Sequence, residues 1–141
     1  MPNDFKITKI TVNVDVSRAI DRTGIHLAMA QRYRQIVLET FGPVGRNRQV
    51  PWPALSKAYA RRVNPPLPTL KRQQGRIYNS IVASADANAG HVSSDSQIGV
   101  YHQFGMGRNP RRPFFPFDLA GNPTPYVASE MNRVVREFLG R

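Results

Sequence analysis

The chain has 141 residues and a formal net charge of +11, from 20 Lys and Arg against 9 Asp and Glu. This length allows one domain with one hydrophobic core, and the 40% apolar content excludes wholesale disorder. The absence of Cys excludes a disulfide scaffold, a thiol nucleophile and cysteine-based zinc sites, and agrees with a reducing cytoplasm.

The N-terminal segment, residues 1–17, alternates apolar and polar residues. Ile10, Val12, Val14 and Val16 have the period of two that is typical of a strand buried on one face. The segment has no continuous apolar block, so we expect neither a signal peptide nor a membrane span. The strand either completes the chain's own sheet or pairs with a neighbouring subunit, and the sequence leaves both open.

A helical period follows the strand. It begins at Ser17 or Asp21, continues to about Thr40, and predicts a helix of roughly twenty residues. Phe41-Gly42-Pro43 ends it, because Gly suits a C-terminal cap and Pro cannot continue the hydrogen-bond ladder. Its apolar stripe is Ile25, Met29, Tyr33, Ile36 and Val37.

The middle of the chain predicts shorter elements. We expect helices over 54–62 and 69–81, then two antiparallel strands over 81–87 and 97–101, with turn-forming residues over 88–95 between them. Residues 105–125 have no period and predict an irregular arm rich in Arg, Phe and Pro. Residues 126–139 predict an amphipathic helix.

These elements predict an α+β fold in one domain over 1–141. A small antiparallel sheet would pack against the long N-terminal helix, the shorter middle helices and the C-terminal amphipathic helix, with long irregular arms. The three His have no metal-ligand spacing, and no carboxylate pair suits acid–base catalysis. We therefore predict no enzyme activity, no catalytic or metal-binding residue and no cofactor.

Basic residues are segregated along the chain. No acidic residue lies between Glu39 and Asp86, where there are eight Lys and Arg. Such a face favours an anionic partner over a merely solvated surface. Phe114, Phe115 and Phe117 follow a second Arg cluster; they either stack on single-stranded nucleic acid or, as we prefer, anchor the arm to its own sheet or to a neighbouring subunit.

Four segments in this order carry a resemblance: Trp52-Pro53-Ala54-Leu55-Ser56, Gly75-Arg76-Ile77-Tyr78-Asn79-Ser80-Ile81, Tyr101-His102-Gln103-Phe104-Gly105 and Pro110-Arg111-Arg112-Pro113-Phe114-Phe115. Together they resemble the bacteriophage virion morphogenesis family, or tail completion proteins, of Mu-like phages. The resemblance extends over about residues 19–139, and it lies in the order of the motifs.

The resemblance implies a structural virion protein without catalytic activity. Its subunits would form a ring at the head-to-tail junction, for which we favour a hexamer, that terminates the tail or joins it to the connector. The implied partners are connector, adaptor or stopper proteins, the tail tube and genomic double-stranded DNA in the lumen, with no membrane. The implied location is the neck of the virion, and the host cytoplasm during assembly.

Such a ring suggests roles for particular residues. The candidates for contacts with DNA or acidic partners are Arg46, Arg48, Arg108, Arg111 and Arg112. The candidates for the subunit interface are Phe114, Phe115 and Phe117, and the expected core anchors are Trp52, Leu55, Ile81 and Tyr101. The alternative function is a non-specific nucleic-acid-binding module that uses the basic face.

Overall fold

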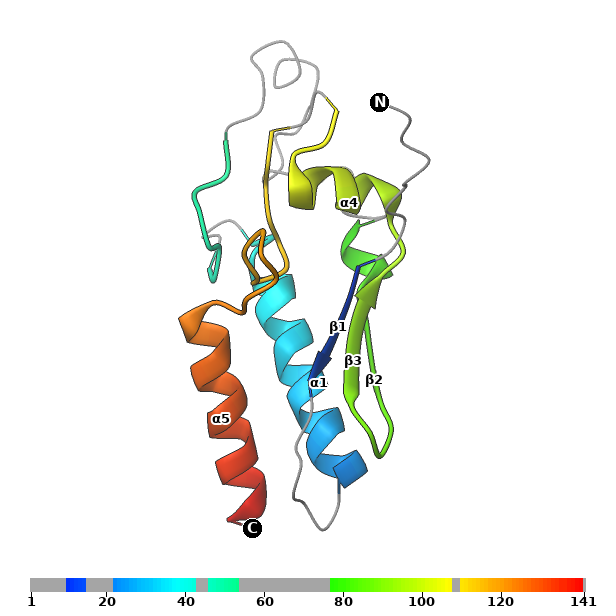
Figure 1. Cartoon of the computed structure of the whole chain (residues 1–141), viewed down its shortest axis with the longest axis vertical. Coiled ribbons are helices and arrows are strands. Elements are labelled where there is room, and N and C mark those ends of the chain that lie inside the picture. The colour runs from blue at the N-terminus through cyan, green and yellow to red at the C-terminus, as the bar shows by residue number, and fades with distance from the viewer. Residues whose placement is uncertain (1–9, 15–21, 43–45, 54–76, 108–109, 141) are drawn as a thin grey trace.

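A computed structural model describes residues 10–14, 22–42, 46–53, 77–107 and 110–140. Its elements in chain order are β1 (Ile10–Val14), α1 (Arg22–Glu39), the 3-10 turn η1 (Tyr78–Ser80), β2 (Val82–Ala85), β3 (Gly90–Ser94), α4 (Gln97–Phe104) and α5 (Pro125–Leu139). Figure 1 shows α1 between the sheet and α5, and α1 packs against both. The predicted α+β class, with a long N-terminal helix and a C-terminal helix, is confirmed.

Helix α1 is the central layer, which explains why so much of it is buried. All five residues of its predicted apolar stripe are buried, together with His26 and Ala30. Its last turn tightens, because the backbone N–H groups of Thr40 and Phe41 each bond to the carbonyl three residues earlier. The helix ends there, close to the predicted boundary.

The three strands form an antiparallel sheet in the order β1-β3-β2. Ile10 lies opposite Ser94, and Val14 lies opposite Gly90. The N-terminal strand is therefore an edge strand of the chain's own sheet, the first of the two alternatives that its sequence allowed.

The predicted strand over 97–101 is wrong, because this segment begins helix α4. Ser96 caps the helix by accepting a 3.1 Å hydrogen bond from the backbone N–H of Gly99. Gly105 ends it in the left-handed conformation, at φ 67°. The two caps favour a helix over the strand propensity of the apolar residues between them.

The strand that pairs with β2 is instead β3, within the segment that we predicted to be a turn. The actual turn is four residues long, and the Asp86 carboxylate accepts hydrogen bonds from the N–H groups of Asn88 and Ala89. Strand β3 pairs on both edges, so pairing with two neighbours outweighs the weak strand propensity of its Gly and Ser residues.

The remaining predicted elements have mixed outcomes. The described part of the arm, residues 105–107 and 110–124, contains no helix or named strand, as expected. Helix α5 begins at Pro125, one residue before the predicted start, with Thr124 as its N-cap. The predicted helix over 54–62 and most of that over 69–81 lie outside the described residues.

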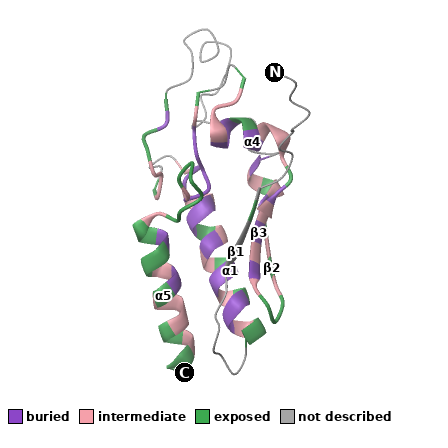
Figure 2. Cartoon of the chain, in the orientation of Figure 1, coloured by how far each residue is buried: buried purple, intermediate pink, exposed green. Residues whose placement is uncertain are grey.

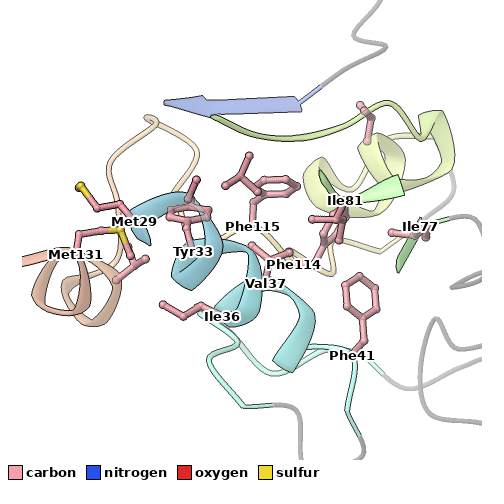
Figure 3. Packing of buried hydrophobic residues seen from close by; sticks show 14 of the residues in the cluster. Met29, Tyr33, Ile36, Val37, Phe41, Ile77, Ile81, Phe114, Phe115 and Met131 are labelled. Carbon is pink, nitrogen blue, oxygen red and sulfur yellow. The ribbon is translucent and has the colours of Figure 1, made fainter. Parts of the chain in front are cut away.

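The buried hydrophobic side chains form one cluster between the layers (Figure 2). Figure 3 shows Phe114 and Phe115 of the arm among the side chains of α1, with Ile77 and Ile81 beside them. Both Phe rings are fully buried. The arm is irregular in backbone, yet it supplies the two largest fully buried side chains of the core.

Candidate functional site

The arm docks against the loop that follows α1, and we call residues 46–53 and 110–117 together the loop–arm junction. Two hydrogen bonds hold its centre. The Trp52 indole Nε1–H donates to the carbonyl of Pro113 at 3.0 Å, and the Arg112 Nε–H donates to the carbonyl of Pro53 at 2.9 Å. Two segments about sixty residues apart in sequence are thereby joined.

Two glutamines bind the arm backbone in place of a neighbouring strand. The Gln103 Oε1 atom accepts hydrogen bonds of 2.8 Å from the N–H groups of Phe114 and Phe115, and its Nε2 donates to the Phe115 carbonyl at 3.1 Å. The Gln49 Nε2 donates to the carbonyls of Phe115 and Phe117 at 3.0 and 2.7 Å. The irregular arm thus satisfies its buried backbone groups, as a buried loop must.

Aromatic rings continue the junction into the core. Phe41 contacts Trp52 edge-on at a centroid distance of 5.8 Å and Phe114 at 5.4 Å. Phe114 contacts Phe115 at 5.3 Å, and Phe115 contacts Phe117 at 6.1 Å. These are the separations that favour aromatic pairs, so the rings connect the end of α1 to the arm.

This packing corrects the prediction that Phe114 and Phe115 lie at a subunit interface. Both side chains have no exposed surface within the chain itself, so neither can insert into a neighbour without unfolding the arm. We preferred anchoring of the arm over stacking on nucleic acid and left open whether the rings anchor it to its own sheet or to a neighbouring subunit; Phe114 and Phe115 anchor it within the chain. Phe117 is partly buried against the same core.

Arg48 is fixed against the end of α1. Its Nε–H donates to the Thr40 carbonyl at 2.8 Å, and its guanidinium carbon lies 3.8 Å from the ring centroid of Trp52. This geometry combines a cation–π contact with a favourable position at a helix C-terminus. Partial burial lowers the pKa of Arg48 from its ordinary value.

The predicted DNA contact at Arg112 is contradicted by its burial. The residue is only 4% exposed, and its Nε donates within the chain. Burial lowers the pKa of Arg112, and burial together with the nearby Arg112 charge lowers the pKa of His102 to about 4. Arg112 therefore has a structural role in holding the arm to the loop.

Two of the other predicted arginines have some surface that a partner could reach. Arg46 is exposed, and Arg111 is partly buried with its Nη2 3.4 Å from the Gln49 Oε1. Arg108 lies outside the described residues. The structure therefore brings Arg48, Arg111 and Arg112, from the two separate basic clusters, to one junction.

The core anchors also divide. Trp52 and Ile81 are buried as predicted, at 9% and 0% exposure. Tyr101 is 36% exposed on α4, and its hydroxyl accepts a hydrogen bond from Gln97, so its predicted core role is wrong. The physical reason is that this segment is a helix, so Tyr101 lies on a different face from the one that a strand would give it. Leu55 lies outside the described residues.

Sequence reasoning missed the two glutamines. Gln103 stands in one of the motifs quoted above, but a side chain that bonds to backbone leaves no periodic pattern. Gln49 has no signal in the sequence beyond its position in a loop.

The described residues offer no group of three His, Asp, Glu or Cys side chains that could hold a metal ion. None of the helices seen there is long and apolar enough to cross a membrane. Comparison with known proteins adds no relative, since no family model, no curated protein and no solved structure matches the chain.

Proposed function

We propose that this chain is a structural virion protein at the head-to-tail junction of a bacteriophage. It would form a ring around the DNA channel that completes the tail or joins it to the connector. The proposal begins from the ordered resemblance of four motifs to tail completion proteins.

One observation carries the proposal furthest: the described parts of the four motifs meet in the fold. Trp52 of the first motif bonds to Pro113 of the fourth, and Gln103 of the third bonds to Phe114 of the fourth. Ile77 of the second motif belongs to the same buried cluster. Contacts between the motifs are what a shared fold requires, so they support the resemblance.

Assembly is the mechanism that this proposal implies. A closed ring needs two different surface patches on each subunit, one for each neighbour. Because Phe114 and Phe115 belong to the core, the patches must come from other residues. The most exposed large hydrophobic side chains of the described residues are Val82, Leu119 and Leu139, on three separate elements or loops.

Sedimentation velocity across protein concentration at two salt levels tests the ring, followed by negative-stain imaging of any large species. We expect closed rings, with six-fold symmetry, from the protein alone or after addition of purified tails that lack it. A monomer under both conditions would contradict the proposal.

A second candidate is a non-specific nucleic-acid-binding module. It is supported by the +11 charge and by Arg46, Arg48 and Arg111 of the loop–arm junction, which form no ion pair with the described carboxylates. Such a module would bind any duplex with an affinity that falls by about three to five decades between 50 and 200 mM salt, if six to ten phosphates are contacted. Tight, salt-dependent binding by a protein that never forms rings would favour this candidate.

A further inference from the structure

Three arginines of the loop–arm junction, Arg46, Arg48 and Arg111, have no ion pair that would neutralise them in the described part of the chain. By contrast, Arg32 and Arg133 both bind the Glu130 carboxylate, at 2.6 and 2.7 Å. Arg32 and Arg133 are therefore neutralised where α1 meets α5, whereas the three junction arginines, like Arg22 and Arg136, have no such partner in the described part of the chain.

Arg48 is preorganised to receive an anion. One donor, Nε, is bonded to the Thr40 carbonyl, and the guanidinium plane lies over Trp52. Its two terminal nitrogens have no hydrogen-bond partner within the described part of the chain. An anion that binds there meets a side chain whose conformational freedom is already lost, so the entropic cost of ordering is small.

Arg111 is also held in place with unused donors. Its backbone packs so closely on Gly105 that a Cβ on that glycine would lie 3.0 Å from the Arg111 Cβ. Its Nε is buried without a hydrogen-bond partner among the described residues, and its only side-chain bond is the long one to Gln49. A buried donor without an acceptor is costly, and the donors of Arg111 that remain for an external acceptor are those of its terminal nitrogens.

In the described part of the chain, no carboxylate forms an ion pair with these three arginines. Between Glu39 and Asp86 the sequence has no carboxylate, and after Arg111 the next is Asp118. The Asp118 carboxylate is engaged in its own loop, where it accepts hydrogen bonds from Ala120 and Asn122. Glu39 is bonded to Asn47 and faces Arg32. The junction therefore presents net positive charge.

The buried aromatic rings identify the form of the polyanion. A single strand is bound by stacking its bases on exposed rings, but Trp52, Phe114 and Phe115 all face the core. The centre of a protein interface is usually more apolar than its rim, and the described loop residues 46–53 expose one large apolar side chain, Val50, at 37%. The remaining chemistry is contact with the phosphates of a duplex, without contact to its bases.

We infer that Arg46, Arg48 and Arg111 bind backbone phosphates of double-stranded nucleic acid, in a sequence-independent manner. The inference rests on the second candidate function and deepens it by naming the arginines and the duplex form of the ligand, and it does not require a ring. Its test is therefore separate from the sedimentation test, and either can fail while the other succeeds.

The test is fluorescence anisotropy with a labelled 30-base-pair duplex between 50 and 200 mM salt. The test variant is Arg46→Gln with Arg111→Gln. The control is Arg22→Gln with Arg136→Gln, which removes the same charge from two exposed positions on α1 and α5 that form no ion pair among the described residues. Circular dichroism melts establish that each protein is folded.

Each phosphate contact contributes about 0.9 to the slope of log affinity against log salt, so the test variant should lose about 1.8 from the slope. With an unchanged value at 1 M salt, this is a roughly 60-fold weaker affinity at 0.1 M. The control should keep the wild-type slope within about 0.5. The loss should be the same for duplexes of different sequence.

Several results would overturn the inference. One is a wild-type protein that does not bind the duplex at 50 mM salt, and another is a folded test variant that keeps the wild-type slope. A control variant that loses as much as the test variant would assign the binding to total charge. Tighter binding of oligo-dT would indicate a single strand, and tighter binding of polyglutamate would indicate an acidic protein.

Arg48 requires a different variant, because its loss would also disturb the end of α1. Arg48→Lys keeps the charge but loses the planar fork over Trp52. We expect an unchanged salt slope with a weaker affinity at every salt concentration. An affinity equal to that of the wild type would remove Arg48 from the site.

Discussion

The Gln103 side-chain oxygen accepts a 2.8 Å hydrogen bond from the backbone N–H of Phe114. It accepts a second bond from the N–H of Phe115, so the Gln103 side chain satisfies the backbone of the arm as a neighbouring strand would in a sheet. A single amide therefore satisfies both of these buried N–H groups of the arm.

Replacement of Gln103 should strongly lower the stability of the fold. Gln103→Leu leaves the buried N–H groups of Phe114 and Phe115 without their acceptor, at about 1–3 kcal/mol for each group. We expect the free energy of unfolding to fall by about 3 kcal/mol in urea titrations. Trp52 is the only tryptophan, and its indole bonds to the arm, so its fluorescence reports the loss.

Gln97→Leu on the same helix is the matched control. Gln97 bonds only to the Tyr101 hydroxyl, at 3.2 Å and exposed, so the change should be below about 0.5 kcal/mol. Equal losses at the two positions would show that Gln103 does not hold the arm.

Gly105 and Gly107 form a second matched pair, because both have a left-handed backbone, at φ 67° and 66°. An alanine at either position has a backbone cost of about 1–2 kcal/mol. At Gly105 the new Cβ would meet the arm, at 3.0 to 3.2 Å from atoms of Arg111, whereas at Gly107 it would meet no described residue within 4 Å. We expect Gly105→Ala to lower the thermal midpoint clearly more than Gly107→Ala; equal shifts would refute the close approach.

Stability should decrease in mild acid because of His102. Its pKa is lowered from 6.5 to about 4 by burial and by the Arg112 charge, so between these values the unfolded chain binds a proton that the folded chain does not. The contribution is therefore complete above pH 6.5 and is lost as the pH falls toward 4. Urea titrations at pH 7 and pH 5 should show a smaller difference for His102→Gln than for the wild type. A difference of the same size in both proteins would assign the acid sensitivity elsewhere.

Glu130 joins α5 to α1 through Arg32, and its protonation should be the main cause of the loss of stability at lower pH. Hydrogen bonds from Arg133 and then Arg32 lower the pKa of Glu130 to about 2. Its stabilising contribution is present above about pH 4.5, the ordinary value for a glutamate, and is lost as the pH falls toward 2. Glu130→Gln should lower the thermal midpoint at pH 7 and should reduce the further drop on acidification to pH 3.

Glu137→Gln is the control for Glu130, since Glu137 is more exposed and pairs only with Arg133 on the same helix. Its midpoint at pH 7 should stay close to that of the wild type, as is usual for exposed pairs. Equal thermal midpoints for the two variants would show that the bond between Glu130 and Arg32 adds no more stability than the exposed pair on α5.

The parts of the fold that the sequence predicted have strong periods. The stripe of α1 and the alternation of β1 repeat often enough to identify both elements. Helix α4 was not predicted, because its apolar residues also suit a strand. Ser96 and Gly105 at its ends are residue types that commonly cap helices, and they could have indicated it. Strand β3 was missed because its Gly and Ser residues have little strand propensity, and its conformation is set by two partners distant in sequence.

The candidate site was predictable in composition but not in geometry. The sequence located the arginines, yet nothing local distinguishes Arg112, which is buried, from Arg111, which keeps unused donors. That distinction depends on the Pro53 carbonyl, 59 residues away. The burial of Phe114 and Phe115 likewise depends on a surface built by α1 much earlier in the chain.

This separation in sequence has a consequence for synthesis. The apolar stripe of α1 leaves the ribosome long before Phe114 and Phe115, which cover it, and at about 5–20 residues per second the delay is roughly 4–15 s. During that interval the helix exposes a surface suited to chaperones or to other nascent chains. A nascent chain that stops before residue 110 should therefore aggregate. A chain that includes Phe114 and Phe115 should not, because the arm then covers the stripe of α1.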